Sequence, residues 1–309
     1  MADEPTPGLP APLEPLWAAG PPGPPGERRG APMPDDLRSV YGGLLTLPLA
    51  DGRPTVVANF VSTVDGVVAL DRVQGSGGGE ISGFDRHDRF VMGLLRSLAD
   101  AVLVAAGTVR AAPNHHWTAR HVFRAAAPTF ADWRSRLELA PQPTTIIVTG
   151  SGDLDPGHPA LHEPDVPVII ATTEPGARHL RRGGLPDHVR IEVLASGVGD
   201  RSGGRLAPAA ILALVASTGA RITLCEGGPR LFAQLLRADL VDELFLTLAP
   251  QIAGRTVQDE RLALVEGAAF APQASLWMDL RSVRRGGGHL FLEYGLVPGV
   301  RAGGLADPT

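Results

Sequence analysis

The sequence predicts an α/β fold in which helices flank a mixed, mostly parallel sheet, with antiparallel strands near the C-terminus. Short β-branched apolar runs such as Thr55 to Val61 alternate with segments of helical spacing, the pattern of successive strand–helix units. Several runs end directly at glycine, proline or aspartate, as strands that lead into turns do. The last two runs flank Arg284–Gly288, a glycine-rich stretch typical of a hairpin.

The first half of the chain supplies three strands and two helices to this prediction. Ser82 is a candidate cap for a helix whose apolar residues fall three and four positions apart, from Val91 to Leu98. The expected strands are Thr55 to Val61, Val67 to Leu70 and Asp100 to Ala106, and a second helix is expected near Ala131 to Leu139.

The second half repeats the alternation more regularly. The expected strands are Thr144 to Val148, Val166 to Ala171, Arg190 to Leu194, Arg221 to Cys225, Val241 to Ala249, Ser275 to Val283 and His289 to Tyr294. Ala207 to Ser217 has a helical pattern, and another helix follows Pro229, with Leu231, Leu235 and Leu236 on one face. We therefore expect one α/β domain over residues 36–298.

The two ends of the chain have a different composition. Residues 1–35 are rich in proline, glycine and alanine, with four prolines clustered around Gly23, and residues 299–309 are similarly poor in large apolar side chains. Such segments bury too little surface to offset the entropy lost on ordering. We expect both to be disordered tails.

Composition excludes several classes of chemistry. All 28 basic residues are arginine, which leaves no lysine for a Schiff base or a P-loop. The net charge of −5 provides no cationic field for nucleic acid or membrane. The single cysteine, Cys225, permits neither an internal disulfide nor a zinc cluster of cysteine pairs. Its place in an apolar run predicts a buried side chain that packs like a small apolar residue. With no apolar run of about 18 residues and no leader-like start, a cytoplasmic location is expected.

Candidate ligand-binding turns occur where expected strands meet helices, which is where open α/β sheets bind ligands. The segment Cys225–Leu231 places two glycines and a proline at such a junction, which suits either an anion seat or a plain strand-to-helix turn. Ala105–Arg110 carries Gly107 and Thr108 after a second strand, and Gly75–Ser82 is a glycine- and serine-rich loop. Spacing alone leaves these alternatives open.

Four further polar positions invite a functional interpretation. Glu226 stands at the tip of an apolar strand, where a carboxylate needs a partner. Asp65 precedes Gly66 and is typical of a turn. His115 and His116 are adjacent and so point in different directions, and neither a carboxylate nor a third histidine lies at ligand spacing, so we expect no metal site.

Together these segments resemble the RibD C-terminal family, the pyrimidine-reductase domain of riboflavin biosynthesis, which has a dihydrofolate-reductase-like fold. Four blocks carry the resemblance in the family's order. They are Arg53-Pro54 with Val61–Gly66, Leu95–Val104 with Gly107-Thr108-Val109, Glu226–Leu231, and Leu240–Leu244 with Ala249-Pro250 and Gly254. With one cysteine, the zinc signature of the family's deaminase half is impossible, so a reductase without that half is expected.

The resemblance implies NADPH-dependent reduction of a pyrimidine- or pteridine-like compound, most closely 5-amino-6-(5-phosphoribosylamino)uracil. The residues that it assigns to NADPH are Val61, Ser62, Gly107, Thr108, Ser151, Gly227, Gly228, Pro229, Arg230 and Leu231. It turns Arg96 and Glu226 toward the substrate and puts His116 in the substrate-contacting segment. The family's frequent dimerisation implies a homodimer.

Three departures from the family pattern leave the substrate open. Ala112 replaces an aspartate, Asn114–Trp117 replaces a leucine and an arginine, and Glu80-Ile81-Ser82 replaces Trp-Ile-Thr. A dihydrofolate-type or other reductase, and a nucleotide-binding sensor without turnover, are therefore alternatives. The candidate proton donors are Glu226 and a water held by Asp65 or His116.

Overall fold

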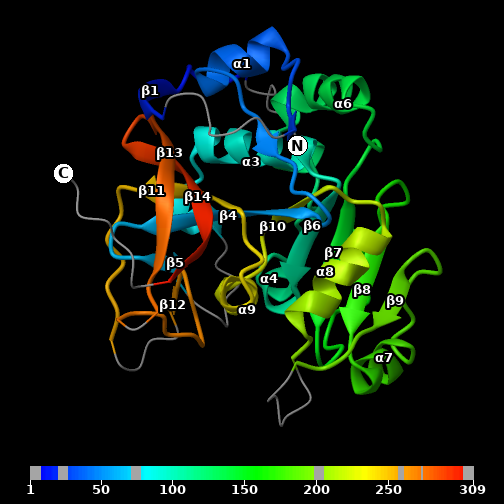
Figure 1. The fold of residues 1–309 in the computed structure, drawn as a ribbon. Coiled ribbons are helices and arrows are strands. Elements are labelled where there is room, and N and C mark those ends of the chain that lie inside the picture. Colours follow the sequence, from blue (N-terminus) through cyan, green and yellow to red (C-terminus); the bar gives the residue numbers. More distant parts are fainter. Residues whose placement is uncertain are drawn as a thin grey trace.

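The computed structural model describes residues 8–19, 27–70, 78–197, 205–256, 261–272 and 274–301, and the side chains up to residue 296. Its largest element is a ten-stranded sheet in the order β1-β13-β14-β11-β4-β10-β6-β7-β8-β9 (Figure 1). The strands from β11 to β9 run parallel to one another, whereas β14 is antiparallel to β11 and to β13, and β1 is antiparallel to β13. The predicted fold class is confirmed.

Apart from β1, the strands of the large sheet follow the predicted runs, and the central strands β4, β6, β7, β8 and β10 are mostly buried on both faces. Their bounds are β1 Glu14–Ala18, β4 Thr55–Thr63, β6 Ala101–Ala105, β7 Thr144–Thr149, β8 Val168–Thr172, β9 Arg190–Val193, β10 Ile222–Cys225, β11 Glu243–Ala249, β13 Leu276–Gly286 and β14 His289–Arg301. Two short pairs stand apart: β2 Arg28–Arg29 with β3 Leu47–Pro48, and β5 Val67–Ala69 with β12 Leu262–Ala263.

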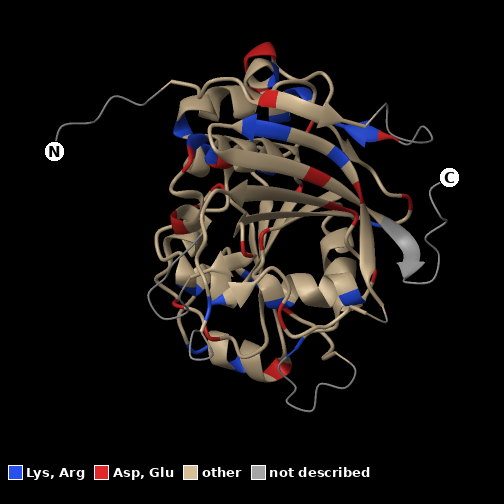
Figure 2. Ribbon diagram, turned by 90° about the vertical axis from the view of Figure 1, so that its left-hand side faces the viewer, with Lys and Arg blue, Asp and Glu red and all other residues tan. Residues whose placement is uncertain are grey.

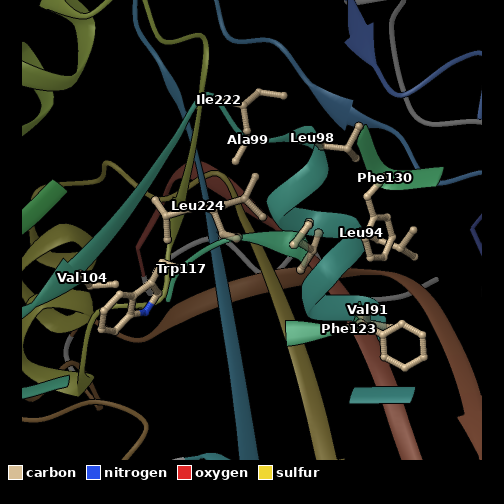
Figure 3. Close-up of a cluster of buried hydrophobic side chains, with 14 of the residues drawn as sticks. Val91, Leu94, Leu98, Ala99, Val104, Trp117, Phe123, Phe130, Ile222 and Leu224 are labelled. Carbon is tan, nitrogen blue, oxygen red and sulfur yellow. The ribbon is translucent and has the colours of Figure 1, made fainter. Parts of the chain in front are cut away.

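Helices cover both faces of the sheet (Figure 1). On one face lie α1 Asp35–Tyr41, α3 Arg86–Leu98 and α6 Ala127–Arg136, and on the other α8 Pro208–Ser217 and α9 Pro229–Arg237. The shorter helices are α2 Gly78–Ser82, α4 Ala106–Ala111, α5 Ala119–Val122, α7 Glu174–Leu180 and the 3₁₀ turns Arg124–Ala126 and Pro159–Leu161. Figure 3 shows Val91, Leu94 and Leu98 of α3 in one buried cluster with Phe123 and Phe130.

The cap of α3 differs from the prediction. Ser82 lies at the end of α2, and the Asp85 side chain caps α3 by accepting a hydrogen bond from the amide of Asp88 at 2.9 Å. Asp85 rather than Ser82 is next to the start of α3, because Gly83 and Phe84, both at positive φ, end the helical conformation of α2.

The N-terminal region also differs from the expected disordered tail over residues 1–35. Strand β1 pairs with β13 at the edge of the sheet, and the Leu13 side chain is 1% exposed. Arg29 donates to the Asp100 carboxylate at 2.7 Å, which joins the same region to the start of β6. Strand pairing and burial of Leu13 offset the entropy of ordering the described parts, 8–19 and 27–35. Residues 1–7 and 20–26 lie outside the described residues.

At the other end of the chain, β14 continues to Arg301, past the expected boundary at residue 298. The rest of that expected tail, residues 302–309, lies outside the described residues. The β13–β14 hairpin is tight, since Gly286 pairs with His289 and leaves only Gly287 and Gly288 in the turn. Gly287 has φ 58°, a conformation that favours glycine.

Candidate active site

The carboxyl ends of the central strands bring the candidate turns together. Strand β10 lies between β4 and β6, parallel to both. Just beyond β10, the amide of Glu226 donates to the carbonyl oxygen of Leu103 in β6 at 3.0 Å. The turns after β10 and β6 meet there: a Cβ on Gly228 would lie 3.4 Å from the Thr108 hydroxyl oxygen. Cys225, the last residue of β10, is fully buried, and burial raises the pKa of its thiol to about 12.

Two glycines, Gly227 and Gly228, occupy the turn from β10 to α9. A Cβ on Gly227 would lie 2.6 Å from a methyl carbon of Leu231, so a larger residue there would require the Leu231 side chain to move. Gly228 is the N-cap of α9, and no side chain caps that end of the helix. The first amides of a helix have no partner within it and carry the positive end of its dipole. Pro229 has no N–H and the amide of Leu231 donates to the carbonyl oxygen of Gly228, so the amides that this turn offers an anion are those of Gly228 and Arg230.

The residues that line this turn match part of the expected cofactor set. Thr108 is half-buried in the first turn of α4, and its hydroxyl has no hydrogen-bond partner among the described residues. Gly107, beside it, is exposed, as is Arg230 in the first turn of α9. Pro229 and Leu231 are buried and shape the helix start. Ser151 is exposed just beyond the end of β7, where its hydroxyl accepts from the amide of Asp153 at 3.3 Å.

Arg96 of α3 and Glu226 form a buried, two-point ion pair. The Nε and Nη2 atoms of Arg96 donate to the two carboxylate oxygens at 3.0 and 2.6 Å. Their side chains are 1% and 8% exposed. A carboxylate at the tip of an apolar strand is stable here because the guanidinium accompanies it.

The remaining donors of Arg96 hold the segment that follows α4. Nη1 donates to the carbonyl oxygens of His116 and Thr118, at 3.1 and 3.2 Å, and Nη2 lies 2.9 Å from Nε2 of His115. A guanidinium has five N–H groups, and all five are therefore used. Every donor of Arg96 is directed at the protein, and the expectation that Arg96 faces the substrate stays a prediction. Arg96 positions Glu226 and residues 115–118.

Four imidazoles lie in the same region. The ring centroid of His121 is 5.0 Å from that of His115 and 4.7 Å from that of His116, while His158 stacks on Trp117 at 5.9 Å. Burial, reinforced by the charge of Arg96, lowers the pKa of His115 to about 2 and keeps its ring neutral. Among the described residues, no group of three histidine, cysteine or acidic side chains has the geometry to hold a metal ion.

His116 is more accessible than its neighbour. Its side chain is 18% exposed, and Nδ1 lies 3.2 Å from a carboxylate oxygen of Glu163. Burial lowers the pKa of His116, and the charge of Glu163 opposes that shift in part. The position, next to the Arg96–Glu226 pair, is compatible with the expected contact to a substrate.

Asp65 has a structural position. Its carboxylate accepts from the Thr63 hydroxyl at 2.6 Å and from the amides of Ala253 and Gly254 at 3.1 and 2.7 Å. These hydrogen bonds lower its pKa to about 2. Asp65 is therefore ionised near neutral pH and ties the turn after β4 to the loop after β11. Its hydrogen bonds serve this connection, and the expectation that Asp65 holds a water as proton donor stays a prediction.

Val61 and Ser62, expected beside the nicotinamide ring, are both buried at the end of β4. The Ser62 hydroxyl donates to the carbonyl oxygen of Thr63 at 2.8 Å. Helix α2 packs on Val61 so closely that a Cβ on Gly78 would lie 2.8 Å from its Cγ1.

Sequence reasoning missed one polar residue on this side, Asp88 in the first turn of α3. Its carboxyl group is buried near the side chains of Ser82 and Thr247, and burial raises its pKa to about 6. In the sequence, Asp88 looks like an ordinary acidic residue at a helix start.

The fold and the site define an open α/β protein with a ligand-binding edge at the carboxyl ends of its parallel strands. The chain belongs to the RibD C-terminal domain family, whose model matches residues 54–288. Family membership indicates an oxidoreductase of the reductase type found in riboflavin biosynthesis. No curated protein matches the chain in sequence.

Solved structures share the fold at low sequence identity. A pyrimidine reductase-like protein of Corynebacterium diphtheriae is 19% identical, with a TM-score of 0.58 over 79% of this chain and 92% of its own. The riboflavin biosynthesis reductase of Saccharomyces cerevisiae is 17% identical, with a TM-score of 0.54 over 79% and 90%. A diaminohydroxyphosphoribosylaminopyrimidine deaminase/5-amino-6-(5-phosphoribosylamino)uracil reductase of Thermotoga maritima is 22% identical, with a TM-score of 0.56 over 79% of this chain and 57% of that protein.

Two general properties of the described residues bear on the site. Arginine and acidic residues are mixed along the strands and loops of the face shown in Figure 2. The helices within these residues are all too short or too polar to cross a membrane.

Proposed function

We propose that the protein is an NADPH-dependent reductase of a pyrimidine- or pteridine-like substrate, similar to 5-amino-6-(5-phosphoribosylamino)uracil reductases. The observation that carries the proposal is the glycine turn from β10 to α9, with its uncapped helix start beside Thr108. That turn suits the pyrophosphate of a dinucleotide, because small residues let the phosphates approach and open amides bind them.

The residues present fit the implied cofactor. Gly228 is half-buried and carries no side chain on the face toward Thr108, and the Thr108 hydroxyl adds a donor with no other partner among the described residues. Exposed Arg230 offers a positive charge at the same helix end. When bound there, NADPH would supply the hydride, and the protein would align the two reacting rings and exclude water.

Glu226 is the side chain best placed to orient a heterocycle next to this seat. Arg96 fixes both of its oxygens, so the carboxylate keeps one geometry whether or not a ligand is bound. An oxygen that accepts from a guanidinium retains a second lone pair, which can accept from an N–H group of a pyrimidine. The carboxylate therefore acts as a fixed acceptor rather than as an acid.

The substrate side of the site differs from the family pattern, which keeps the pteridine alternative open. Ala112 stands where the family has an aspartate, and its carbonyl oxygen contacts Nε2 of His158 at 3.0 Å. Asn114–Trp117 lies beside the Arg96–Glu226 pair, where it would meet a substrate.

Fluorescence titration of the purified protein with NADPH tests the proposal. We expect saturable binding at micromolar to submillimolar concentration, weakened by inorganic pyrophosphate. The matched control is NADH, which carries the same pyrophosphate and lacks one phosphate. Absence of NADPH binding at near-millimolar concentration would overturn the proposed function.

A further inference from the structure

We propose that Arg110 of α4 binds the 2′-phosphate that distinguishes NADPH from NADH, and that Asp153, with which Arg110 pairs, weakens that preference. The inference deepens the proposed function and rests on it. The glycine turn after β10 cannot make the distinction, because both dinucleotides carry the same pyrophosphate. A cation beside the adenosine ribose can make it, since the 2′-phosphate is attached there.

The order of the strands sets the direction in which a dinucleotide would extend. The proposed pyrophosphate seat lies between the ends of β10 and β6, where Gly228 and Thr108 approach each other. The nicotinamide side is expected at Val61 and Ser62 of β4, the neighbour of β10 on the other side. Neighbouring strands are about 4.8 Å apart. The adenosine half would therefore extend the opposite way, across the end of β6 toward β7.

Arg110 lies on that path, two residues after Thr108. Helix α4 follows β6 directly and contacts β7, and it lies between the start of α9 and the end of β7 (Figure 1). The Arg110 side chain reaches the loop after β7, where Nη1 donates to the carbonyl oxygen of Asp153 at 2.7 Å. Nε and Nη2 of Arg110 have no partner among the described residues, and 50% of the side chain is exposed. These N–H groups are available to a phosphate.

Ser151, which the family resemblance assigns to the cofactor, lies at the same place. Its hydroxyl accepts from the amide of Asp153 at 3.3 Å, while Arg110 donates to the carbonyl oxygen of the same residue. One residue thus connects the guanidinium to the hydroxyl. Both side chains are exposed, so a phosphate can reach them from solvent. A guanidinium binds a phosphate by charge-assisted hydrogen bonds, and a hydroxyl adds a further donor.

The Asp153 carboxylate competes with a phosphate for Arg110. Its Oδ2 lies 3.3 Å from Nη1 of Arg110, and its side chain is 71% exposed. A second exposed carboxylate, that of Asp155, lies in the same loop and accepts from the amide of Gly157 at 2.9 Å. A phosphate monoester carries a charge of about −1.5 to −2 near neutral pH, so it attracts the guanidinium more strongly than one carboxylate does. The carboxylates repel the same phosphate, and the preference for NADPH is therefore moderate.

Arg230 has a different relation to the cofactor. It is exposed in the first turn of α9, at the proposed pyrophosphate seat. A charge there acts on the two phosphates that NADPH and NADH share. Arg230 should therefore strengthen the binding of both dinucleotides by a similar factor, whereas Arg110 should act on NADPH alone.

Fluorescence titration of the wild type and of variants with NADPH and with NADH tests the inference. We expect the wild type to bind NADPH about five- to tenfold more tightly than NADH, the factor for one exposed charge-assisted hydrogen bond. Arg110→Gln keeps an N–H donor and loses the charge. It should weaken NADPH binding alone and bring the two dissociation constants within about twofold of each other. Asp153→Asn should strengthen NADPH binding about two- to fivefold and change NADH binding little.

Two further arginine variants are the controls. Arg136→Gln removes the same charge from an exposed ion pair, that of Arg136 with Asp132 on α6, whose side chains are 52% and 49% exposed. It should leave both dissociation constants unchanged. Arg230→Gln should raise both dissociation constants and leave their ratio unchanged.

The outcomes separate this inference from the proposed function. A wild type that binds neither dinucleotide overturns the proposed function and this inference with it. A wild type that binds both equally tightly overturns this inference alone. So does an Arg110→Gln variant that keeps the wild-type ratio of the two dissociation constants, because the ion pair with Asp153 would then be merely structural.

A second measurement needs no variant. Adenosine 2′,5′-bisphosphate and adenosine 5′-phosphate differ by the 2′-phosphate alone, and each is used to displace NADPH from the wild type. We expect the bisphosphate to displace NADPH at the lower concentration. Because Arg110 is exposed, the difference should shrink as salt is raised from about 20 mM to about 500 mM. Displacement at equal concentrations in low salt would overturn the inference.

Discussion

Arg96 and Glu226, 130 residues apart in the chain, meet in a two-point ion pair whose oxygen–nitrogen distances are 3.0 and 2.6 Å. The pair joins α3 to the end of β10 and, through the carbonyl oxygens of His116 and Thr118, to the segment after α4. The pair holds the Glu226 carboxylate, the proposed hydrogen-bond acceptor for the substrate, in place. Its contribution to the free energy of unfolding can be measured.

Removing the Arg96 side chain is expected to lower the free energy of unfolding more than replacing Glu226 by glutamine does. Arg96→Met leaves the Glu226 carboxylate buried without a cation and should lower the free energy of unfolding by about 3–5 kcal/mol. Glu226→Gln keeps one acceptor for Arg96 and leaves the hydrogen bonds of Arg96 to His116 and Thr118 in place, so it should cost less, about 1–3 kcal/mol. Urea unfolding measures both values. Equal losses in the free energy of unfolding for the two variants would contradict this prediction. They would show that the hydrogen bonds of Arg96 to residues 116 and 118 add nothing to stability.

The proposed phosphate seat predicts opposite effects of one substitution on stability and on binding. Gly228→Asp supplies a good N-cap for α9 and should leave the free energy of unfolding unchanged or slightly higher. The same carboxylate occupies and repels the phosphate position, so NADPH affinity should fall at least about tenfold, or about 1.4 kcal/mol. Gly228→Asn, a cap without charge, is the matched control and should lose less affinity. If Asp and Asn bind NADPH as tightly as glycine does, the cofactor lies elsewhere.

Neutral His115 makes the fold sensitive to acid. Its pKa is about 2 in the folded protein and 6.5 in the unfolded chain, so the unfolded chain binds more protons below pH 6.5. Stability is fully present above pH 6.5 and is lost as pH falls, at up to about 1.4 kcal/mol per unit. His115→Asn should reduce the loss between pH 7 and 5 by on the order of 1–2 kcal/mol.

Urea unfolding at the two pH values measures this difference. His188→Gln, at an exposed position, is the control and should change the pH dependence little. A His115→Asn variant that loses as much stability as the wild type does would contradict the assignment of a buried neutral ring.

The N-terminal segment is expected to stabilise the domain although it precedes the family match. Leu13 is 1% exposed, and its amide donates to the carbonyl oxygen of Val40 at 2.7 Å. Leu13→Ala should cost about 2–5 kcal/mol by thermal or urea unfolding. Leu16→Ala, in the adjoining edge strand with 48% of its side chain exposed, should cost far less. Similar small losses at both positions would mean that residues 8–19 contribute little in solution.

The sequence predicted most of the fold because strand and helix periods are local signals. It missed β1, because a proline-rich composition is typical of disorder and the partner of Trp17, Val283, is far along the chain. A strand held at a sheet edge by such distant pairing leaves no periodic signal of its own.

The site was predicted in part for the same reason. Glycines and a proline at the end of an apolar strand predict a strand-to-helix turn, which the structure confirms, and the phosphate seat there stays a prediction. The role of Arg96 could not be predicted, since the sequence shows its charge but not that Glu226, His115 and the carbonyl oxygens of residues 116 and 118 use all its donors. Asp88 was hidden because its burial depends on Thr247, 159 positions later, across the sheet.

The most direct measurement of the central claim is substrate-dependent oxidation of NADPH by the wild-type protein, followed by the loss of NADPH absorbance. We expect oxidation with the deaminated pyrimidine intermediate or with dihydrofolate, and slower oxidation by Gly228→Asp at the same cofactor concentration. The contrary result is NADPH that stays reduced with both substrates, which would contradict a reductase of this substrate class.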